Sequence, residues 1–153
     1  MATLAQKLAH LAAELALFPD PQEQLAFLVD RAKRVPPLAA AERSEANRVH
    51  GCVSVVWLTG EMRCGCCHFR ADADSPLVRG LVIFLAEFFS GASPAEVAAS
   101  ELDPLETLGL TRQLSPTRRH GLAAARTHLL ELARTEARKL TPPDLLLDPP
   151  GAK

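Results

Sequence analysis

The 153-residue sequence contains no tyrosine, a single tryptophan and no excess of charge of either sign. Its 17 Lys and Arg residues are balanced by 18 Asp and Glu residues, which leaves a formal net charge of -1. A chain without a strongly positive field has little to hold a polyanion, so we expect no nucleic-acid partner. The longest apolar run, residues 81–86, stops at Glu87 and is too short to cross a membrane, so no membrane partner is expected either.

Several patterns that mark enzymes and exported proteins are also missing. The sequence has no glycine-rich phosphate loop, no GxSxG motif and no paired acids of the kind used by hydrolases. Residues 1–15 lack a positively charged start and a continuous apolar stretch, and they include Glu14, an acid that a transit peptide would avoid. We therefore expect a cytoplasmic protein whose four cysteines are thiols or metal ligands rather than disulfides.

Prolines and capping residues divide the chain into predicted helices. Thr3 and Gln6 form a capping box ahead of leucines at helical spacing, which predicts the first helix. Further helices are predicted to begin at residues 20–21, 74–76, 93–94, 103–104 and 115–116, and the last of them should end near residue 140. We expect one domain over residues 1–140, followed by a proline-rich, poorly ordered tail at residues 141–153.

The β-rich part of the sequence follows a polar stretch, residues 39–49, that is typical of a surface loop. Residues 52–59 are rich in β-branched side chains and end at a glycine, and residues 61–63 and 66–71 form two more short segments around a turn. The order of two helices, a small sheet and then several helices predicts an α+β fold, with a three-stranded antiparallel sheet packed against the helices.

Cys52 is the first candidate for chemistry, because it directly follows Gly51 at the point where the polar loop is predicted to become a strand. A thiolate attacks another protein's sulfur only where that sulfur can reach it, and a neighbouring glycine lets a partner's backbone come close. Arg48 and His50 would lower the pKa of this thiol if the loop folds them toward it. The alternative is a small buried hydrophobic residue at the start of a strand.

The second candidate is the CGCCH segment at residues 64–68, which is composed of zinc and iron–sulfur ligand types. If residues 66–71 form a strand, adjacent cysteines point to opposite faces and cannot both join one tetrahedral site. A strained disulfide between the adjacent cysteines is a further alternative. The metal-binding alternative, a zinc or iron–sulfur module with Cys52 as the remaining ligand, would use Cys64, Cys66, Cys67 and His68.

Four segments, taken in order, resemble the SufE family of sulfur acceptors. Residues 47–57, NRVHGCVSVVW, are similar to the family hallmark Val-x-Gly-Cys-x-Ser-x-Val-Trp. The other three are VPPL at residues 35–38, DADSPLVRGL at residues 72–81 and LSPTRRHGL at residues 114–122. The resemblance extends from the first predicted helix to the end of the last, and it implies the two-layer SufE/NifU-like fold.

The resemblance also implies a function and partners. Cys52 occupies the place of the cysteine that accepts persulfide sulfur, and Arg118 that of an arginine near it, which gives Arg118 a supporting role. Arg48, His50 and Gly51 would form the loop that binds the partner. The implied partners are a pyridoxal-phosphate-dependent, SufS-like cysteine desulfurase, which this protein would stimulate, and a SufBCD-like iron–sulfur scaffold. The acceptor itself would be no enzyme and would need no cofactor, because the carbon–sulfur bond is cleaved on the desulfurase.

The sequence departs from the family pattern in two respects. Val53 and Val55 stand where many members have glutamine, so polar contacts around the acceptor loop should differ. Three further cysteines follow Cys52, and they are open to three interpretations: variation without function, an internal relay for sulfur, or a metal site. Trp57 is expected to belong to the core.

Overall fold

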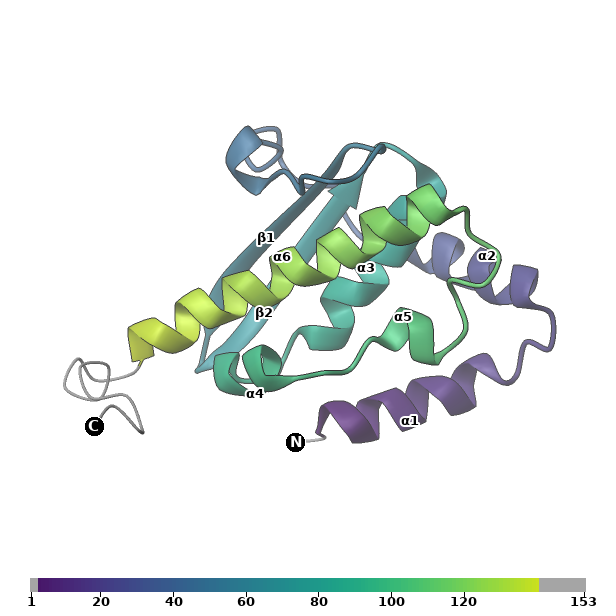
Figure 1. The fold of residues 1–153 in the computed structure, drawn as a ribbon, viewed down its shortest axis with the longest axis horizontal. Helices are drawn as coiled ribbons and strands as arrows, with labels where there is room; N and C mark the ends of the chain where they lie inside the picture. Colours follow the sequence, from purple (N-terminus) through teal and green to yellow (C-terminus); the bar gives the residue numbers. More distant parts are fainter. Residues whose placement is uncertain (1–2, 141–153) are drawn as a thin grey trace.

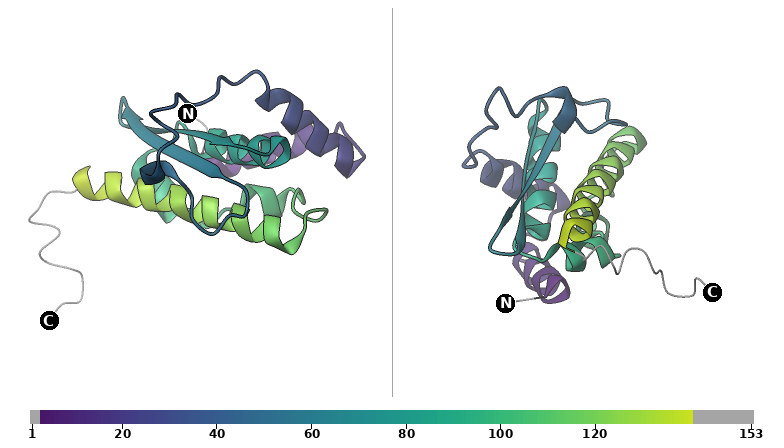
Figure 2. Two further views of the ribbon diagram at one scale, coloured as in Figure 1. Left: turned by 90° about the horizontal axis from the view of Figure 1, so that it is seen from above. Right: turned by 90° about the vertical axis from the view of Figure 1, so that its left-hand side faces the viewer.

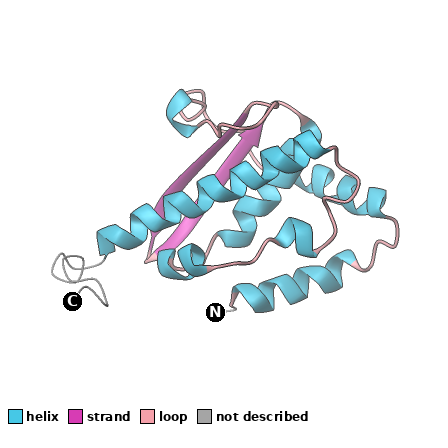
Figure 3. Cartoon of the chain, viewed as in Figure 1, coloured by secondary structure: helices cyan, strands magenta, loops and turns pink. Residues whose placement is uncertain are grey.

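The structure is a computed structural model that describes residues 3–140. The proline-rich segment at residues 141–153, for which a poorly ordered tail is expected, lies outside the described residues. Helices surround one small antiparallel sheet (Figures 1 and 3). The elements in order are α1 (Leu4–Leu15), α2 (Pro21–Ala32), the short 3-10 helix η1 (Glu45–Asn47), β1 (Val56–Arg63), β2 (Cys66–Ala73), α3 (Pro76–Phe89), α4 (Pro94–Ala99), α5 (Pro104–Thr107) and α6 (Pro116–Leu140).

The helices begin where the capping residues predict. The Thr3 hydroxyl accepts a hydrogen bond from the Gln6 backbone amide, and the Gln6 side chain accepts one from the Thr3 amide, which completes the capping box of α1. Each helix from α2 to α6 has proline at its first position, where no intrahelical N–H is needed. Side chains that accept from first-turn amides are those of Asp20, Ser93, Asp103 and Ser115.

The sheet has two strands among the described residues, so the three-stranded expectation is wrong. β1 continues through Gly60 to Arg63 and pairs along its whole length with β2. Gly60 stands opposite Phe69, and a β-carbon at Gly60 would lie 3.2 Å from the Phe69 ring. The glycine therefore makes room for an aromatic ring on the partner strand and does not end the strand.

Helices α3 and α6 cover one face of the hairpin, as Figure 2 shows from two further directions. Helix α2 lies behind α3, and the two helices come close where a β-carbon on Gly80 would lie 3.1 Å from the Val29 backbone. The other face is partly covered by the loop before β1, in which Arg43 lies 5.9 Å from the Trp57 ring centroid. Trp57 is thus half-buried on this outer face and is not part of the core.

A buried ion pair joins this loop to the helices. Asp72, in β2, accepts hydrogen bonds from the Arg79 guanidinium at 2.8 Å and from the Leu38 amide at 3.1 Å. The same guanidinium donates to the carbonyls of Ala32 and Val35, at the end of α2. Burial opposes ionisation of Asp72, but the hydrogen bonds from Arg79 and the backbone hold the pKa of that carboxyl below its ordinary value. Arg79 therefore holds three parts of the fold together: the sheet, α3 and the chain that leaves α2.

Of the helices formed by residues 3–140, none combines the length and the apolar character needed to span a bilayer.

Candidate functional site

Cys52 lies in a loop between η1 and β1 whose two ends are tied together. The Val49 amide donates to the Val56 carbonyl at 2.8 Å, which closes the loop at its base. Val55 exchanges two hydrogen bonds with Asp74: its amide donates to the Asp74 carboxylate and its carbonyl accepts from the Asp74 amide, each at 3.1 Å. The expected strand therefore starts at Val56, and Cys52 belongs to a short tethered loop. Backbone partners that a strand would supply are here supplied by the Asp74 side chain and main chain.

The Cys52 side chain turns toward the first turns of α6. Its thiol donates to the Gly121 carbonyl, with 3.1 Å between sulfur and oxygen. Gly121 has no side chain to block this approach, since a β-carbon there would lie 3.2 Å from the Cys52 sulfur. The thiol is half-buried, so it is held against the helix but is not sealed inside the core.

Gly51 brings the loop this close to α6. Its φ angle of +96° lies in the region that side chains disfavour, and a β-carbon would stand 3.3 Å from that of Ala124. Gly51 thus allows close packing of the loop on α6, whereas the approach of a partner's backbone stays a prediction.

A small, mainly apolar pocket adjoins the thiol. Arg118 lies at this pocket, so the structure brings together Cys52 and the arginine that the sequence singles out. Among residues 3–140, the Arg118 guanidinium has no hydrogen-bond or ion-pair partner. The pocket is lined by Cys52, Val53, Ser54, Val56, Val78, Val82, Thr117, Arg118, Gly121 and Leu122.

Arg48 and His50 do not support the thiol in the way the sequence suggests. Arg48 lies 3.9 Å and His50 3.7 Å from the carboxylate of Glu45, so both side chains are directed to the same acid. Burial raises the pKa of the Cys52 thiol above its ordinary value. In the free protein, Cys52 is therefore mainly a neutral thiol at neutral pH.

This environment predicts slow alkylation of Cys52. At pH 7.5 we expect iodoacetamide to modify Cys52 several-fold more slowly than the exposed Cys64, because only the thiolate reacts and burial limits both ionisation and access. Since the pKa of Cys52 is raised, its rate should keep rising with pH above 9.0, the ordinary value for a thiol. Peptide mass spectrometry measures both rates, and guanidinium should abolish the difference. Equal rates in the folded protein would contradict the burial described here.

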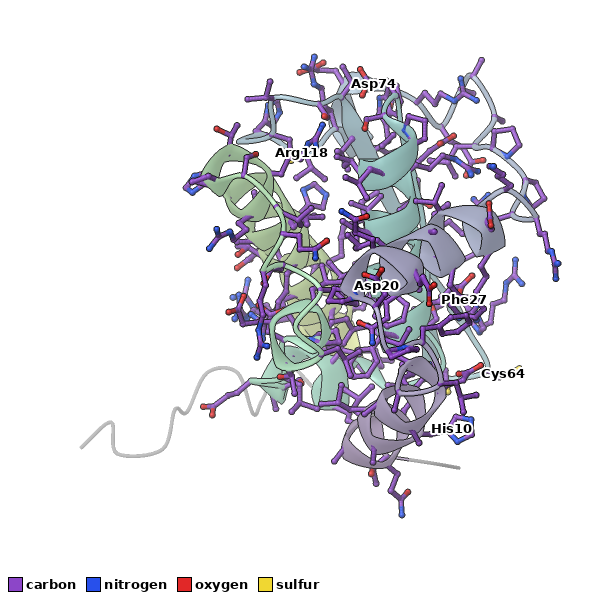
Figure 4. All side chains as sticks on the ribbon, turned by 90° about the vertical axis from the view of Figure 1, so that its right-hand side faces the viewer. His10, Asp20, Phe27, Cys64, Asp74 and Arg118 are labelled. Atoms are coloured by element: carbon purple, nitrogen blue, oxygen red, sulfur yellow. The ribbon has the colours of Figure 1, made fainter. Side chains whose placement is uncertain are left out.

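The other cysteines lie at the opposite end of the hairpin. Figure 4 shows Asp74 and Arg118 at one end of the molecule and Cys64 toward the other. A strand rises about 3.3 Å per residue, so the eight residues of β1 separate the two ends by roughly 23 Å. An internal sulfur relay within one chain is therefore excluded by distance.

The metal-binding alternative finds no support in the same region. Cys67 is 1% exposed and faces the core, whereas Cys66 and His68 lie on the other face of β2. Within the part of the chain that the structure describes, no group of three His, Cys, Asp or Glu residues is arranged to hold a metal ion. Cys52, the remaining ligand of that hypothesis, lies beyond the other end of β1.

Three residues of the site were not singled out as functional from sequence. Gly121 receives the thiol, Asp74 ties the loop, and Val53 leaves its side chain 82% exposed beside the thiol. Gly121 and Asp74 both lie in segments that resemble the SufE family, and this resemblance could have indicated that they belong to the site. An exposed valine carries no such signal, because its exposure depends on the path of the loop.

Comparison with known proteins points to one family. The family model SufE, described as an Fe–S metabolism associated domain, matches residues 9–133. An uncharacterized SufE-like protein of Synechocystis is 32% identical over 120 residues, which cover 78% of this chain and 76% of that protein. An uncharacterized SufE-like protein of Rhizobium etli is 33% identical over 125 residues, covering 77% and 83% of the two chains.

Two further matches support less: one covers a small part of the related protein, and the other shows the fold alone. The chloroplastic quinolinate synthase of Oryza sativa subsp. japonica is 41% identical over 103 residues, but these make up 65% of this chain and only 14% of that protein. The solution structure of a hypothetical protein from Thermus thermophilus has a TM-score of 0.71 at 24% identity, covers 86% of this chain and 96% of its own, and thus shows the fold. With the family model matched over most of its length, the chain belongs to the SufE family.

Proposed function

We propose that this protein accepts persulfide sulfur on Cys52 from a cysteine desulfurase, stimulates that enzyme, and passes the sulfur to iron–sulfur cluster assembly. The observation that carries the proposal is the Cys52 thiol, held by Gly121 in a short loop and sharing a pocket with the unpaired guanidinium of Arg118. Membership of a family described by Fe–S metabolism supports the same direction. The donor would be a pyridoxal-phosphate-dependent, SufS-like enzyme, and the receiver a SufBCD-like scaffold.

The reaction is a thiol–persulfide exchange. Once the Cys52 thiol has lost its proton, the thiolate attacks the outer sulfur of the persulfide on the desulfurase cysteine. A sulfur–sulfur bond to Cys52 forms as the donor's bond breaks, and the desulfurase cysteine leaves as a thiolate. No electrons are gained or lost overall. Because free thiols are needed throughout, the reaction fits a reducing compartment such as the cytoplasm.

Arg118 is suited to assist this exchange. Its guanidinium is always charged and is engaged with no other side chain among residues 3–140, so it is available to an anionic sulfur at the pocket. In the free protein the pKa of Cys52 is raised by burial. We infer that docking of the donor brings the guanidinium and the thiolate together.

Sulfur loading tests the proposal directly. The protein is incubated with a desulfurase, pyridoxal phosphate and cysteine, and the peptide that contains Cys52 is then weighed by mass spectrometry without reductant. We expect that peptide to gain one sulfur atom, which dithiothreitol removes. If the sulfur is found on the Cys64 peptide and not on that of Cys52, the assignment fails.

Val53 should contribute to docking of the donor. It presents an apolar side chain, 82% exposed, directly beside the acceptor thiol, and apolar groups of this kind gain free energy when a partner covers them. Replacing Val53 by aspartate should weaken stimulation of the desulfurase about tenfold, the equivalent of roughly 1.4 kcal/mol, because a charge would have to be desolvated at the interface. Desulfurase activity measured against acceptor concentration checks this.

A matched control comes from Leu17, which is 77% exposed beyond the end of α1. The Leu17→Asp variant places the same charge on an equally exposed apolar position away from the acceptor loop. It should stimulate the desulfurase as the wild type does. Equal losses in both variants would show that Val53 has no specific part in docking.

A further inference from the structure

The turn at the end of the β1–β2 hairpin carries thiols that take no part in the sulfur transfer proposed for Cys52. Cys64 and Gly65 have φ angles of +52° and +79°, and they connect Arg63 and Cys66, which pair as the last residues of the two strands. Two left-handed residues between paired strand ends form a tight hairpin turn, for which Asn-Gly or Asp-Gly is the preferred sequence. Here a cysteine takes the position that usually suits asparagine.

Cys64 and Cys66 are within reach of each other. Residues two apart in sequence have Cα atoms separated by at most about 7 Å in an extended chain, and by less in a turn. A disulfide requires a Cα separation of roughly 4.4–6.8 Å, a range that residues two apart can reach in a turn. Gly65 between them lets the turn adjust its dihedral angles when the ring closes. Both thiols are free and reachable, since Cys64 is exposed and Cys66 half-buried.

The two remaining cysteines are not competitors for this pairing. Cys67 is 1% exposed on the core face of β2, and burial first, then the charge of Glu136, raises the pKa of its thiol to about 11. It therefore stays protonated and shielded while Cys66, its neighbour, points to the opposite face. Cys52 is at the other end of β1. Among the described residues, Cys64 and Cys66 are thus a separate pair.

The side chains around the pair suggest the kind of oxidant. Arg63 stands directly across from Cys66 in the strand register, and His68 follows on the same face of β2. Arg63 is 64% exposed and is also paired with Glu61 at 2.5 Å, which keeps its guanidinium on the hairpin tip. Because Glu61 neutralises Arg63, this pair gives the tip no net charge, and it is the exposure of Cys64 that admits a small disulfide.

We propose that Cys64 and Cys66 form a redox-active dithiol that exchanges with small disulfides such as oxidised glutathione. The thiolate of Cys64 attacks the glutathione disulfide, a mixed disulfide forms, and one glutathione leaves as its thiolate. Cys66 loses its proton and attacks the Cys64 sulfur, which releases the second glutathione and closes the Cys64–Cys66 disulfide. The pair gives up two electrons and two protons in all, and both are received by the two glutathione molecules.

The experiment uses the full chain with Cys52→Ser, which removes the proposed acceptor and keeps the two activities separable. The protein is equilibrated without oxygen in mixtures of reduced and oxidised glutathione, quenched with acid, unfolded and alkylated. Trypsin releases residues 64–70, CGCCHFR, as one peptide that holds all three hairpin cysteines. As the oxidised share rises, we expect this peptide to lose two hydrogen atoms and to carry a single alkyl group, which fragmentation places on Cys67.

Variants decide which thiols take part. Cys64→Ser and Cys66→Ser should each lose the disulfide completely and instead retain one glutathione on the thiol that is left. Cys67→Ala should keep the disulfide. A Cys66–Cys67 disulfide, stable glutathione on Cys64 in the parent protein, or a fully reduced peptide at every glutathione ratio would each overturn the proposal. The mapping in the parent protein decides the question even if the Cys67 variant does not fold.

Discussion

A Cys52→Ser variant is expected to take up no sulfur from a cysteine desulfurase and to give the enzyme no stimulation. A serine hydroxyl is not ionised near neutral pH and forms no persulfide, so the exchange has no acceptor atom. We expect loading to fall to background, at least about 100-fold below wild type, as for loss of other nucleophiles. Mass spectrometry measures the added sulfur, and sulfide or alanine release measures stimulation.

Cys64→Ser is the matched control for this variant. It makes the same atom replacement at an exposed cysteine beyond the far end of β1, a strand roughly 23 Å long. Loading and stimulation should equal those of the wild type. Full stimulation by Cys52→Ser, or a comparable loss in Cys64→Ser, would place the acceptor elsewhere.

Replacing Arg79 by methionine is expected to lower the free energy of unfolding by about 3 kcal/mol, because it leaves the buried Asp72 carboxylate without its main partner. The carbonyls of Ala32 and Val35 lose their donor in the same step. Denaturant titration measures the free energy, and the melting temperature should fall by roughly 6–12 °C. A loss of less than about 1 kcal/mol would contradict the role given to this ion pair.

Arg43→Met provides the comparison, since Arg43 also lies near Asp72, at 3.5 Å, but is 40% exposed. A pair with one exposed partner contributes little, and we expect a cost of about 0–1 kcal/mol. Double replacement of Asp72 by asparagine and Arg79 by methionine should recover part of the loss, because the unpaired charge is then gone.

The pH dependence of the Arg79 variant follows from the same ion pair. In the wild type the pKa of Asp72 is lowered, so its charged form stabilises the fold above the unfolded-state pKa, and this contribution is lost as pH falls through the lowered value. In Arg79→Met the main group that lowers the pKa is missing while burial still acts to raise it. The stability difference between variant and wild type should therefore shrink as the solution is made acidic.

Local signals in the sequence were enough to predict where the helices start. Proline at the first helical position and a capping side chain before it act within one turn, so the starts at Pro94, Pro104 and Pro116 follow from nearby residues alone. For Gly51 the sequence predicts close approach of a partner's backbone; the structure shows a close approach to α6, and the approach of a partner stays a prediction.

The errors arise where a distant residue decides. A glycine such as Gly60 is typical of the end of a strand, so the sequence predicts that the strand stops there. The Phe69 ring opposite Gly60 explains why the strand continues. Val53 and Val55 have strand propensity, yet Asp74, nearly twenty residues away, holds Val55 in a loop instead. The contacts of Arg79 with the end of α2 are equally non-local, and periodicity does not report them.

The tie between Val49 and Val56 limits how far the acceptor can travel. Cys52 is three residues from the first of these anchors and, toward β1, three from Val55, which Asp74 holds. At about 3.6 Å per residue, the Cys52 backbone can move no more than about 11 Å from either anchor, even with the loop fully drawn out. In the proposed exchange, the donor's cysteine must therefore come to Cys52 within this short radius of the two anchors.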